Sequence, residues 1–231
     1  MSKRHGSTSL MEYRELGYLP EALFNFLALL GWSPEGEEEI LEKQQIVGSF
    51  TLERVSRSPA VFDLEKLNWM NQQYLKKLDP QELDKRLQPF IGATTYSEQV
   101  AGLSSEQRSW LMEAVRERMV CLKDIEHLLP LFFAEPSIEE EAQQVLRQPG
   151  VKEVLQTLDH KLPDEENPEA YRQCLKAVVK ELKLKAKDVF MPARCALTGQ
   201  VHGPDLNMIM AVWGKKETSR RLQKAIERLD D

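Results

Sequence analysis

The sequence contains few cysteines and no long apolar run. Its three cysteines, Cys121, Cys174 and Cys195, lie far apart and form no C-x-x-C pair, so they indicate reduced thiols and not a disulfide framework or a zinc site. No apolar stretch approaches the length of about eighteen residues that is typical of a membrane-spanning helix, and the N-terminal residues lack the pattern of a secretory signal peptide. We therefore expect a cytoplasmic protein that holds no metal and does not enter a membrane.

A nucleotide-binding α/β domain is also missing from the sequence. It has no βαβ pattern, no glycine-rich turn between a strand and a helix, and no H-x-G-H-like tetrapeptide. Sustained alternation of apolar and polar residues is absent, whereas apolar residues recur every three to four positions, as at Leu23, Phe26, Leu27 and Leu30. That period is typical of helices. The sequence therefore predicts an all-α fold of serial helical subdomains.

Prolines, glycines and capping residues predict where helices begin. The start signals are Asp79-Pro80-Gln81-Glu82, Ser104 with Gln107, Ser137 with Glu140, and Asn167-Pro168. The helix after Asn167 should reach about Leu182, and a last helix should run from about Lys215 to Leu229. Breaks near 79–80 and 135–137 predict three pieces, which are 1–78, 79–135 and 136–231.

Charge is distributed unevenly along the chain. The formal net charge is −6, which by itself argues against a nucleic-acid binder. Residues 171–231, however, carry thirteen Lys and Arg against seven Asp and Glu, as expected when one region of a protein contacts phosphate. The same residues also fit a second interpretation, because lysines spaced by three to four positions form the solvated face of an ordinary helix. These are Lys176, Lys180, Lys183 and Lys187.

Several segments, in order along almost the whole chain, resemble signatures of bacterial-type glutamyl-tRNA synthetases. They are Ser2-Lys3-Arg4-His5-Gly6, Tyr13-Arg14-x-x-Gly17-Tyr18-Leu19-Pro20, Leu29-Leu30-Gly31-Trp32, Ser58-Pro59-Ala60-Val61-Phe62-Asp63 with Lys66-Leu67-x-Trp69-Met70-Asn71, and Met191-Pro192-x-Arg194-x-Ala196-Leu197-Thr198-Gly199 with Gly203-Pro204-x-Leu206. The resemblance is to the C-terminal half of such an enzyme. It implies an active-site loop and stem-contact fold over 1–78, followed by two anticodon-binding subdomains over 79–135 and 136–231.

The resemblance implies a catalytic role for the N-terminal loop. Lys3 matches the second lysine of the family's K-x-S-K-R loop, which helps to activate the amino acid with ATP and Mg²⁺, and Arg4 is its partner. Mobile basic side chains of this kind can bind a triphosphate and stabilise charge on a leaving pyrophosphate. The leading lysine of the loop has no counterpart, because Met1 stands at the second position. Without the N-terminal catalytic half, we expect the chain alone to form no glutamyl-adenylate.

The resemblance also implies a set of anticodon-binding residues. Arg194 matches an arginine at the anticodon-reading surface, and Gly203, Pro204 and Leu206 fall on a turn that contacts the last two anticodon bases. Arg118 falls where family members that discriminate between tRNAs keep an arginine for the first anticodon base. The chemistry fits, because single-stranded bases stack on planar groups and bind donors at their edges, and Arg194 supplies both. Gly203-Pro204 also fits a plain turn between helices.

Three functions remain open from the sequence. The first is the tRNA-binding half of a glutamate–tRNA ligase, acting as a monomer on tRNA(Glu), and also on tRNA(Gln) in an enzyme that does not discriminate. The second is a stand-alone tRNA-binding module without catalysis. The third is a helical scaffold that binds no RNA, which would be favoured if charge reversal in one basic segment changed no interaction. That segment holds Lys215, Lys216, Arg220 and Arg221.

Overall fold

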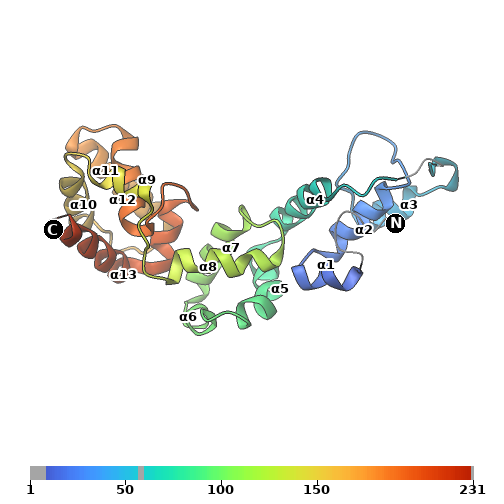
Figure 1. The fold of residues 1–231 in the computed structure, drawn as a ribbon, viewed down its shortest axis with the longest axis horizontal. Coiled ribbons are helices and arrows are strands. Elements are labelled where there is room, and N and C mark those ends of the chain that lie inside the picture. The colour runs from blue at the N-terminus through green and yellow to red at the C-terminus, as the bar shows by residue number, and fades with distance from the viewer. Residues whose placement is uncertain (1–8, 57–59, 230–231) are drawn as a thin grey trace. The chain divides into compact units, whose positions relative to one another are not determined.

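The computed structural model describes residues 9–56 and 60–229, and in these ranges the chain is helical. Thirteen α-helices and two short 3-10 helices follow one another (Figure 1), and the one extended pairing in the same ranges is an isolated antiparallel bridge between Trp32 and Val55. The predicted all-α fold is confirmed. No helix in this part of the chain is long and apolar enough to cross a bilayer.

Contacts divide the chain into two compact units. The first comprises 1–90 and 116–126, and the second comprises 91–115 and 127–231. Most helices of the first unit come early in the chain: α1 (Leu10–Leu16), α2 (Pro20–Leu29), α3 (Lys43–Ser49), η1 (Leu52–Arg54), α4 (Leu64–Lys77), α5 (Pro80–Gly92) and η2 (Leu122–Asp124). The other helices belong wholly or mainly to the second unit: α6 (Ser97–Ala101), α7 (Ser105–Arg116), α8 (Ile125–Phe133), α9 (Glu140–Leu146), α10 (Val151–His160), α11 (Pro168–Leu182), α12 (Ala186–Thr198) and α13 (Leu206–Arg228). Compact units are not the same as functional subdomains, so the division into three pieces stays a prediction.

The first unit is built around the contact between α2 and α4. Phe26 of α2 packs with Leu67 and Met70 of α4 in one apolar cluster. The fully buried Asn71 of α4 satisfies its polar atoms within this unit, accepting a hydrogen bond from the Leu19 N–H at 2.8 Å and donating to the carbonyl of Val120. Because an unpaired buried amide would cost free energy, Asn71 fixes both chain segments against α4.

Gly17, in the Tyr13-Arg14-x-x-Gly17 segment, occupies a position that requires glycine. It ends α1 in the left-handed region with φ +81°, and its carbonyl accepts a hydrogen bond from the N–H of Leu122 at 3.0 Å. A Cβ at this position would lie 2.6 Å from the Leu122 side chain. Only glycine fits both the conformation and the close approach.

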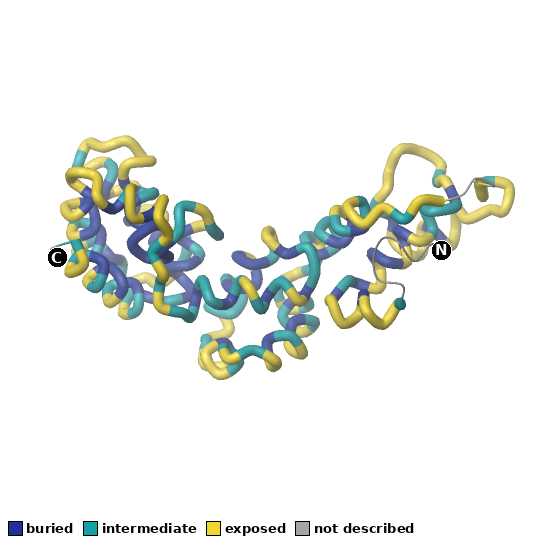
Figure 2. The backbone as a smooth tube through the Cα atoms, viewed as in Figure 1, coloured by how far each residue is buried: buried dark blue, intermediate teal, exposed yellow. Residues whose placement is uncertain are grey.

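The second unit contains the larger core. Helices α10, α11, α12 and α13 contact one another pairwise, and α9 packs on α12, so that their inner faces are buried (Figure 2). The largest fully buried side chain is that of Tyr171 on α11. It packs in one cluster with Leu175 of the same helix and with apolar residues of the neighbouring helices, which include Leu155, Leu197 and Leu222.

Three of the four predicted helix starts are confirmed. The carboxylate of Asp79 accepts hydrogen bonds from two N–H groups in the first turn of α5, Ser104 and Gln107 cap each other before α7, and Asn167 caps α11, which ends at the predicted Leu182. The fourth start was wrong. Helix α9 begins at Glu140 with Glu139 as its N-cap, because the preceding segment pairs with the end of α12 through Glu139 N–H and the Gly199 carbonyl.

The last helix is kinked, and the sequence predicted only the part of it that follows the kink. Helix α13 spans Leu206–Arg228, and Gly214 interrupts it with φ 74° and ψ 176°. The carboxylate of Glu166 accepts a hydrogen bond from the N–H of Lys215 at 2.6 Å, which caps the segment after the kink. The predicted start at about Lys215 is therefore the second half of α13, whereas the first half was not predicted.

Candidate nucleic-acid interface

The residues implied for the interface fall in three places. Lys3 and Arg4 lie outside the described residues, as do Ser58 and Pro59 of the signature before α4. Arg118 lies in the first unit. The others, Arg194, Gly203, Pro204 and Leu206, lie in the second unit, at α12 and the turn that joins it to α13.

Arg194 and the turn after α12 are directly connected. The Nη1 atom of Arg194 donates a hydrogen bond to the carbonyl oxygen of Pro204 at 2.7 Å, and Arg194 is half-buried. A Cβ at Gly203 would lie 2.9 Å from the same Nη1. The guanidinium therefore lies close against the backbone at Gly203, and a side chain at that position would require the guanidinium to shift.

The two ends of the turn are anchored in the core. Gly199 ends α12 in the left-handed region with φ +77°, and a Cβ there would lie 2.2 Å from the carbonyl oxygen of Ser137. At the other end, Pro204 is buried and the Leu206 side chain is 3% exposed within the core cluster. Leu206 therefore anchors the first turn of α13, and its side chain offers a bound base no exposed surface.

One face of helix α12 carries both basic and apolar side chains, and Arg194 is the last of them. Lys187 and Arg194 are seven residues apart, so they lie on one face of the helix, and Phe190 and Met191 lie between them. Phe190 and Met191 are partly buried against the core, so they pack on it without being fully enclosed. A half-buried arginine beside partly exposed apolar side chains is a combination that proteins use to stack unpaired bases.

Arg118 stands apart from these residues. It is exposed in a turn after α7, in the first unit. The neighbouring Arg116 donates a hydrogen bond to the carbonyl of Leu78 at 2.9 Å within the first unit. The position of Arg118 does not test its role at the first anticodon base, which stays a prediction.

The basic segment of α13 is not the open surface that its sequence suggests. The Arg221 guanidinium is buried, with its residue 4% exposed. It contacts the carboxylate of Glu217 at 2.7 Å, donates to the carbonyl of Ala134 at 2.9 Å and lies 4.1 Å from the centre of the Trp213 ring. Arg221 therefore connects α13 to the end of α8, and reversing its charge would disrupt the fold.

Two further cations of that segment are engaged as well. Lys215 pairs with Asp164 at 2.6 Å, and Arg220 pairs with Glu217 at 2.7 Å and with Glu135 at 2.8 Å. Charge reversal across this segment would therefore not test RNA binding cleanly. The signal that could have revealed this is the spacing of Glu217 from Arg220 and Arg221, which is the i, i+3 and i, i+4 spacing of helical ion pairs.

The cysteines carry no chemistry that the interface could use. Burial raises the pKa of the Cys174 thiol to about 11 and that of the Cys195 thiol to about 11. Burial and the Asp124 carboxylate raise the pKa of the Cys121 thiol to about 12. Thiols with such pKa values are protonated at neutral pH and are poor nucleophiles. Among the described residues, no group of His, Cys, Asp and Glu side chains is placed to hold a metal ion.

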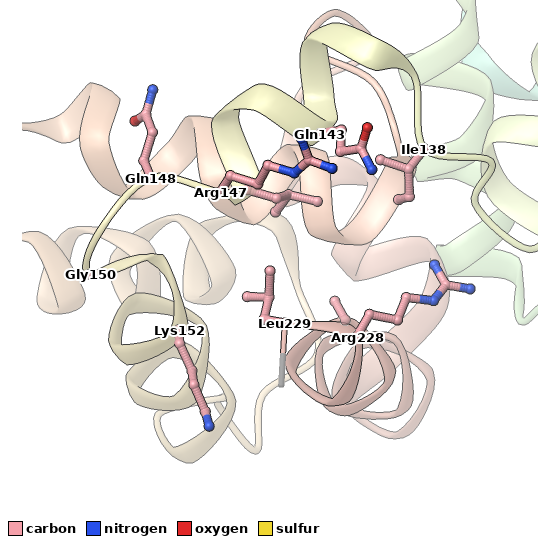
Figure 3. Close-up of a pocket in the computed structure, with 10 residues that line it drawn as sticks. Ile138, Gln143, Arg147, Gln148, Gly150, Lys152, Arg228 and Leu229 are labelled. Carbon is pink, nitrogen blue, oxygen red and sulfur yellow. The ribbon is translucent and has the colours of Figure 1, made fainter. Parts of the chain in front are cut away.

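A separate cleft of about 610 Å³ lies among α9, α10 and α13. Its lining includes the apolar Ile138 and Leu229 together with three cations, Arg147, Lys152 and Arg228. These cations do not converge: Arg147 reaches toward Gln143, whereas Lys152 and Arg228 point in different directions (Figure 3). None of the residues predicted for the interface lines this cleft.

Comparison with known proteins identifies the family. The family model described as an anticodon-binding domain matches residues 64–226. The chain belongs to this anticodon-binding domain family. A second model, for the catalytic domain of class I tRNA synthetases (E and Q), matches residues 1–69. The residues around Arg194 thus lie inside the anticodon-binding domain match.

Relatives of this chain include glutamate–tRNA ligases from bacteria. One from Heliobacterium modesticaldum is 44% identical over 98% of this chain and 47% of its own length, and one from Geobacillus stearothermophilus is 41% identical over 98% of this chain and 48% of its own length. The crystal structure of a glutamate tRNA ligase from Elizabethkingia meningosepticum matches 94% of this chain and 43% of its own with a TM-score of 0.82 and 32% identity. The chain spans about half the length of these relatives and corresponds to their C-terminal half.

Proposed function

We propose that this chain is the tRNA-recognition half of a glutamate–tRNA ligase. The observation that carries the proposal is the hydrogen bond from Arg194 to Pro204, which holds a half-buried arginine against a glycine-containing turn inside the anticodon-binding domain. The parent reaction joins glutamate to tRNA(Glu) in two ATP-dependent steps through glutamyl-adenylate. In that reaction the chain supplies anticodon recognition and part of the ATP-binding loop.

The proposed contact at Arg194 combines stacking with hydrogen bonding. A guanidinium is planar and carries five N–H donors in a fixed arrangement, so it can stack on a splayed base or bind its edge. The Pro204 contact restricts the arginine to one region before RNA arrives, which lowers the entropic cost of binding. Gly203 lets the backbone approach a base, and the buried Pro204 and Leu206 hold the turn in place.

Arg118 is proposed as a separate determinant that reads the first anticodon base. Its side chain is exposed, and an arginine that binds a base edge at two points discriminates between bases by about 1–3 kcal/mol. With such a contact the enzyme would favour tRNA(Glu). Without it, tRNA(Gln) would become a second substrate.

Lys3 and Arg4 are proposed to act on ATP and its Mg²⁺ in the intact enzyme. Their positive charges would stabilise the charge that develops on the departing pyrophosphate. Such groups accelerate a reaction only when the rest of the site positions the substrates. The chain by itself is therefore expected to bind tRNA and to form no adenylate.

Exposed apolar side chains support a partner for the first unit. Twelve of the large apolar residues that the structure leaves exposed fall between residues 10 and 69, and one, Leu184, falls elsewhere in the described chain. This segment is the one matched by the catalytic-domain model. Apolar surface that monomers leave exposed in one region can mark an interaction site, and we propose that a nucleotide-binding catalytic domain covers these side chains. The side chains are Leu10, Met11, Leu16, Phe24, Leu27, Val47, Phe50, Leu52, Val55, Val61, Leu64 and Trp69.

A titration with labelled tRNA(Glu), and with the same tRNA carrying a scrambled anticodon, tests the proposal at two salt concentrations. Tighter binding of the intact anticodon at both concentrations is expected. Equal and steeply salt-dependent binding of the two would leave a generic basic surface. Pyrophosphate exchange after addition of a ligase catalytic half separates a ligase half from a stand-alone tRNA-binding module, which would bind tRNA and restore no exchange. No binding to either tRNA would favour the scaffold function.

A further inference from the structure

Five exposed lysines gather where α11 ends and α12 begins. They are Lys176, Lys180, Lys183, Lys185 and Lys187, and together they are named the lysine corner. Within residues 9–56 and 60–229, none of the five forms an ion pair with a carboxylate. The acidic side chains nearest in sequence are Glu181, which pairs with Lys161 at 2.5 Å, and Asp188 in the first turn of α12.

Several other cations of the second unit are paired. Lys215 contacts Asp164 at 2.6 Å, and Lys224 contacts Glu135 at 3.1 Å. The whole chain carries a net charge of −6, so carboxylates are plentiful. A group of five cations without such partners is therefore a local concentration of positive potential that folding does not use.

Helix geometry connects the lysine corner with the turn at Arg194. Lys176, Lys180 and Lys183 are spaced by four and three residues, so they lie along one face of α11 and its end. Lys187 and Arg194 share a face of α12, about 10 Å apart along the helix axis. A strand of RNA that places a base at Arg194 therefore also lies near Lys187 on the same helix.

Lys183 adopts a left-handed backbone conformation that is unfavourable for a residue with a side chain. It ends α11 with φ 53° and ψ 34°, and it is the one non-glycine residue with positive φ in the described chain. Glycine is favoured at this position of a helix end, because a Cβ is strained there. Since the side chain is exposed and forms no ion pair or side-chain hydrogen bond within the described residues, the lysine contributes charge to the surface and not packing to the core.

We propose that the lysine corner binds the phosphate backbone of RNA next to the bases that contact the Arg194 turn. This inference rests on the proposed function and assigns the electrostatic part of binding to residues separate from those that read bases. Phosphate contacts set affinity and its salt dependence, whereas base contacts set sequence preference. The two sets should therefore respond differently to substitution.

The test uses two variants of the full chain, Lys183→Gly and the triple change Lys180→Gln, Lys183→Gln and Lys187→Gln. For each variant, binding of an anticodon stem-loop RNA and thermal unfolding are measured. Lys183→Gly should raise the unfolding midpoint and weaken RNA binding about fivefold at 0.1 M salt, the value of one lost single-strand phosphate contact. The triple variant should lower the slope of log K against log salt by about 2. Preference for the intact anticodon over a scrambled one should be unchanged in both.

Lys216→Gln is the matched control. Lys216 is exposed in the second unit, and its neighbour Lys215 contacts Glu166 just before α11 begins, whereas the lysine corner lies at the far end of α11. The control should bind RNA as the wild type does. If the wild type prefers the intact anticodon and the lysine variants keep its affinity and salt slope, the lysine corner is excluded and the proposed function stands. If the wild type binds neither RNA, the RNA-binding role of the lysine corner and the proposed function are both wrong. Binding of the wild type to vesicles with anionic headgroups would then assign the lysine corner to a membrane surface.

Discussion

The guanidinium of Arg194 and the backbone of Pro204 are held together by a hydrogen bond of 2.7 Å from Nη1 to the proline carbonyl oxygen. Because Arg194 belongs to α12 and Pro204 to the turn before α13, this bond ties the shape of the turn to the helix. The side chain best suited to contact a base is thus also the one that holds the turn. Substitutions at either residue should change both RNA binding and local stability.

Replacement of Arg194 by alanine should weaken binding of an anticodon stem-loop by about 1–3 kcal/mol at fixed salt. Loss of the contact to Pro204 should also lower the free energy of unfolding by about 1–2 kcal/mol. Arg194→Lys keeps the charge and loses the planar group, so it should restore little of the affinity. Arg147→Ala, an exposed arginine of the same unit, is the control, and equal affinities for it and for Arg194→Ala would remove Arg194 from the interface.

Gly203→Ala should weaken RNA binding with a smaller effect on stability. The added Cβ would lie 2.9 Å from Arg194 Nη1, so the arginine must move, while the ends of the turn remain anchored. Affinity should fall by about 1 kcal/mol and the free energy of unfolding by less than about 1 kcal/mol. Gly92→Ala, where no atom lies within 4 Å of the new Cβ, is the control and should bind RNA normally. A Gly203→Ala protein that binds like this control would contradict the proposed geometry.

Arg118→Gln should relax discrimination between tRNA(Glu) and tRNA(Gln). The arginine is proposed to contact the first anticodon base, and glutamine cannot reproduce its pair of parallel donors. The ratio of the two dissociation constants should move toward one by about tenfold, the equivalent of a contact worth about 1.4 kcal/mol. Measurement of both constants on one protein preparation decides the matter, since an unchanged ratio would assign the first anticodon base to another residue.

Glu217→Gln should reveal a pH-dependent contribution to stability. Hydrogen bonds from Arg220 and then Arg221 lower the pKa of the Glu217 carboxyl below its usual value, so the folded chain releases this proton more readily than the unfolded chain. The resulting stability is present at neutral pH and is lost as pH falls through the folded pKa. The variant should be less stable than the wild type by about 2 kcal/mol at pH 7, and the difference should shrink below about pH 4.

Urea unfolding at several pH values measures this difference. Glu227→Gln changes an exposed carboxylate on the same helix, and it should stay within about 0.5 kcal/mol of the wild type throughout. A Glu217→Gln deficit that persisted unchanged at low pH would mean that the substitution acts through packing and not through charge.

Much of the fold could be predicted because its determinants are local. Asp79, Ser104 and Asn167 cap helices by bonding backbone groups two or three residues away, and such bonds depend on sequence neighbours alone. The second half of α13 was predictable for a similar reason, since its apolar positions follow the helical period. The kink at Gly214 and the helix before it were harder to predict from the sequence, because the segment 206–213 is apolar on most sides and shows no clear helical period.

The candidate site was less accessible to sequence reasoning, because burial there depends on tertiary contacts. Arg221 has the sequence context of a surface helix, yet Trp213 and two distant carbonyl groups enclose it. Leu206 matched a base-contacting turn by its position in a motif, yet its side chain is in the core. The link between Arg194 and Pro204 depends on how the turn folds back toward α12, which the spacing of ten residues does not determine.

The ratio of two dissociation constants decides whether the Arg194 turn reads the anticodon. They are those of the unmodified chain for an anticodon stem-loop of tRNA(Glu) and for the same hairpin with a scrambled anticodon, at one salt concentration. Recognition through a bidentate or stacked arginine predicts a ratio of about tenfold or more, and Arg194→Ala should bring it close to one. Equal constants for the unmodified chain would show that the turn held by Arg194 does not read the anticodon.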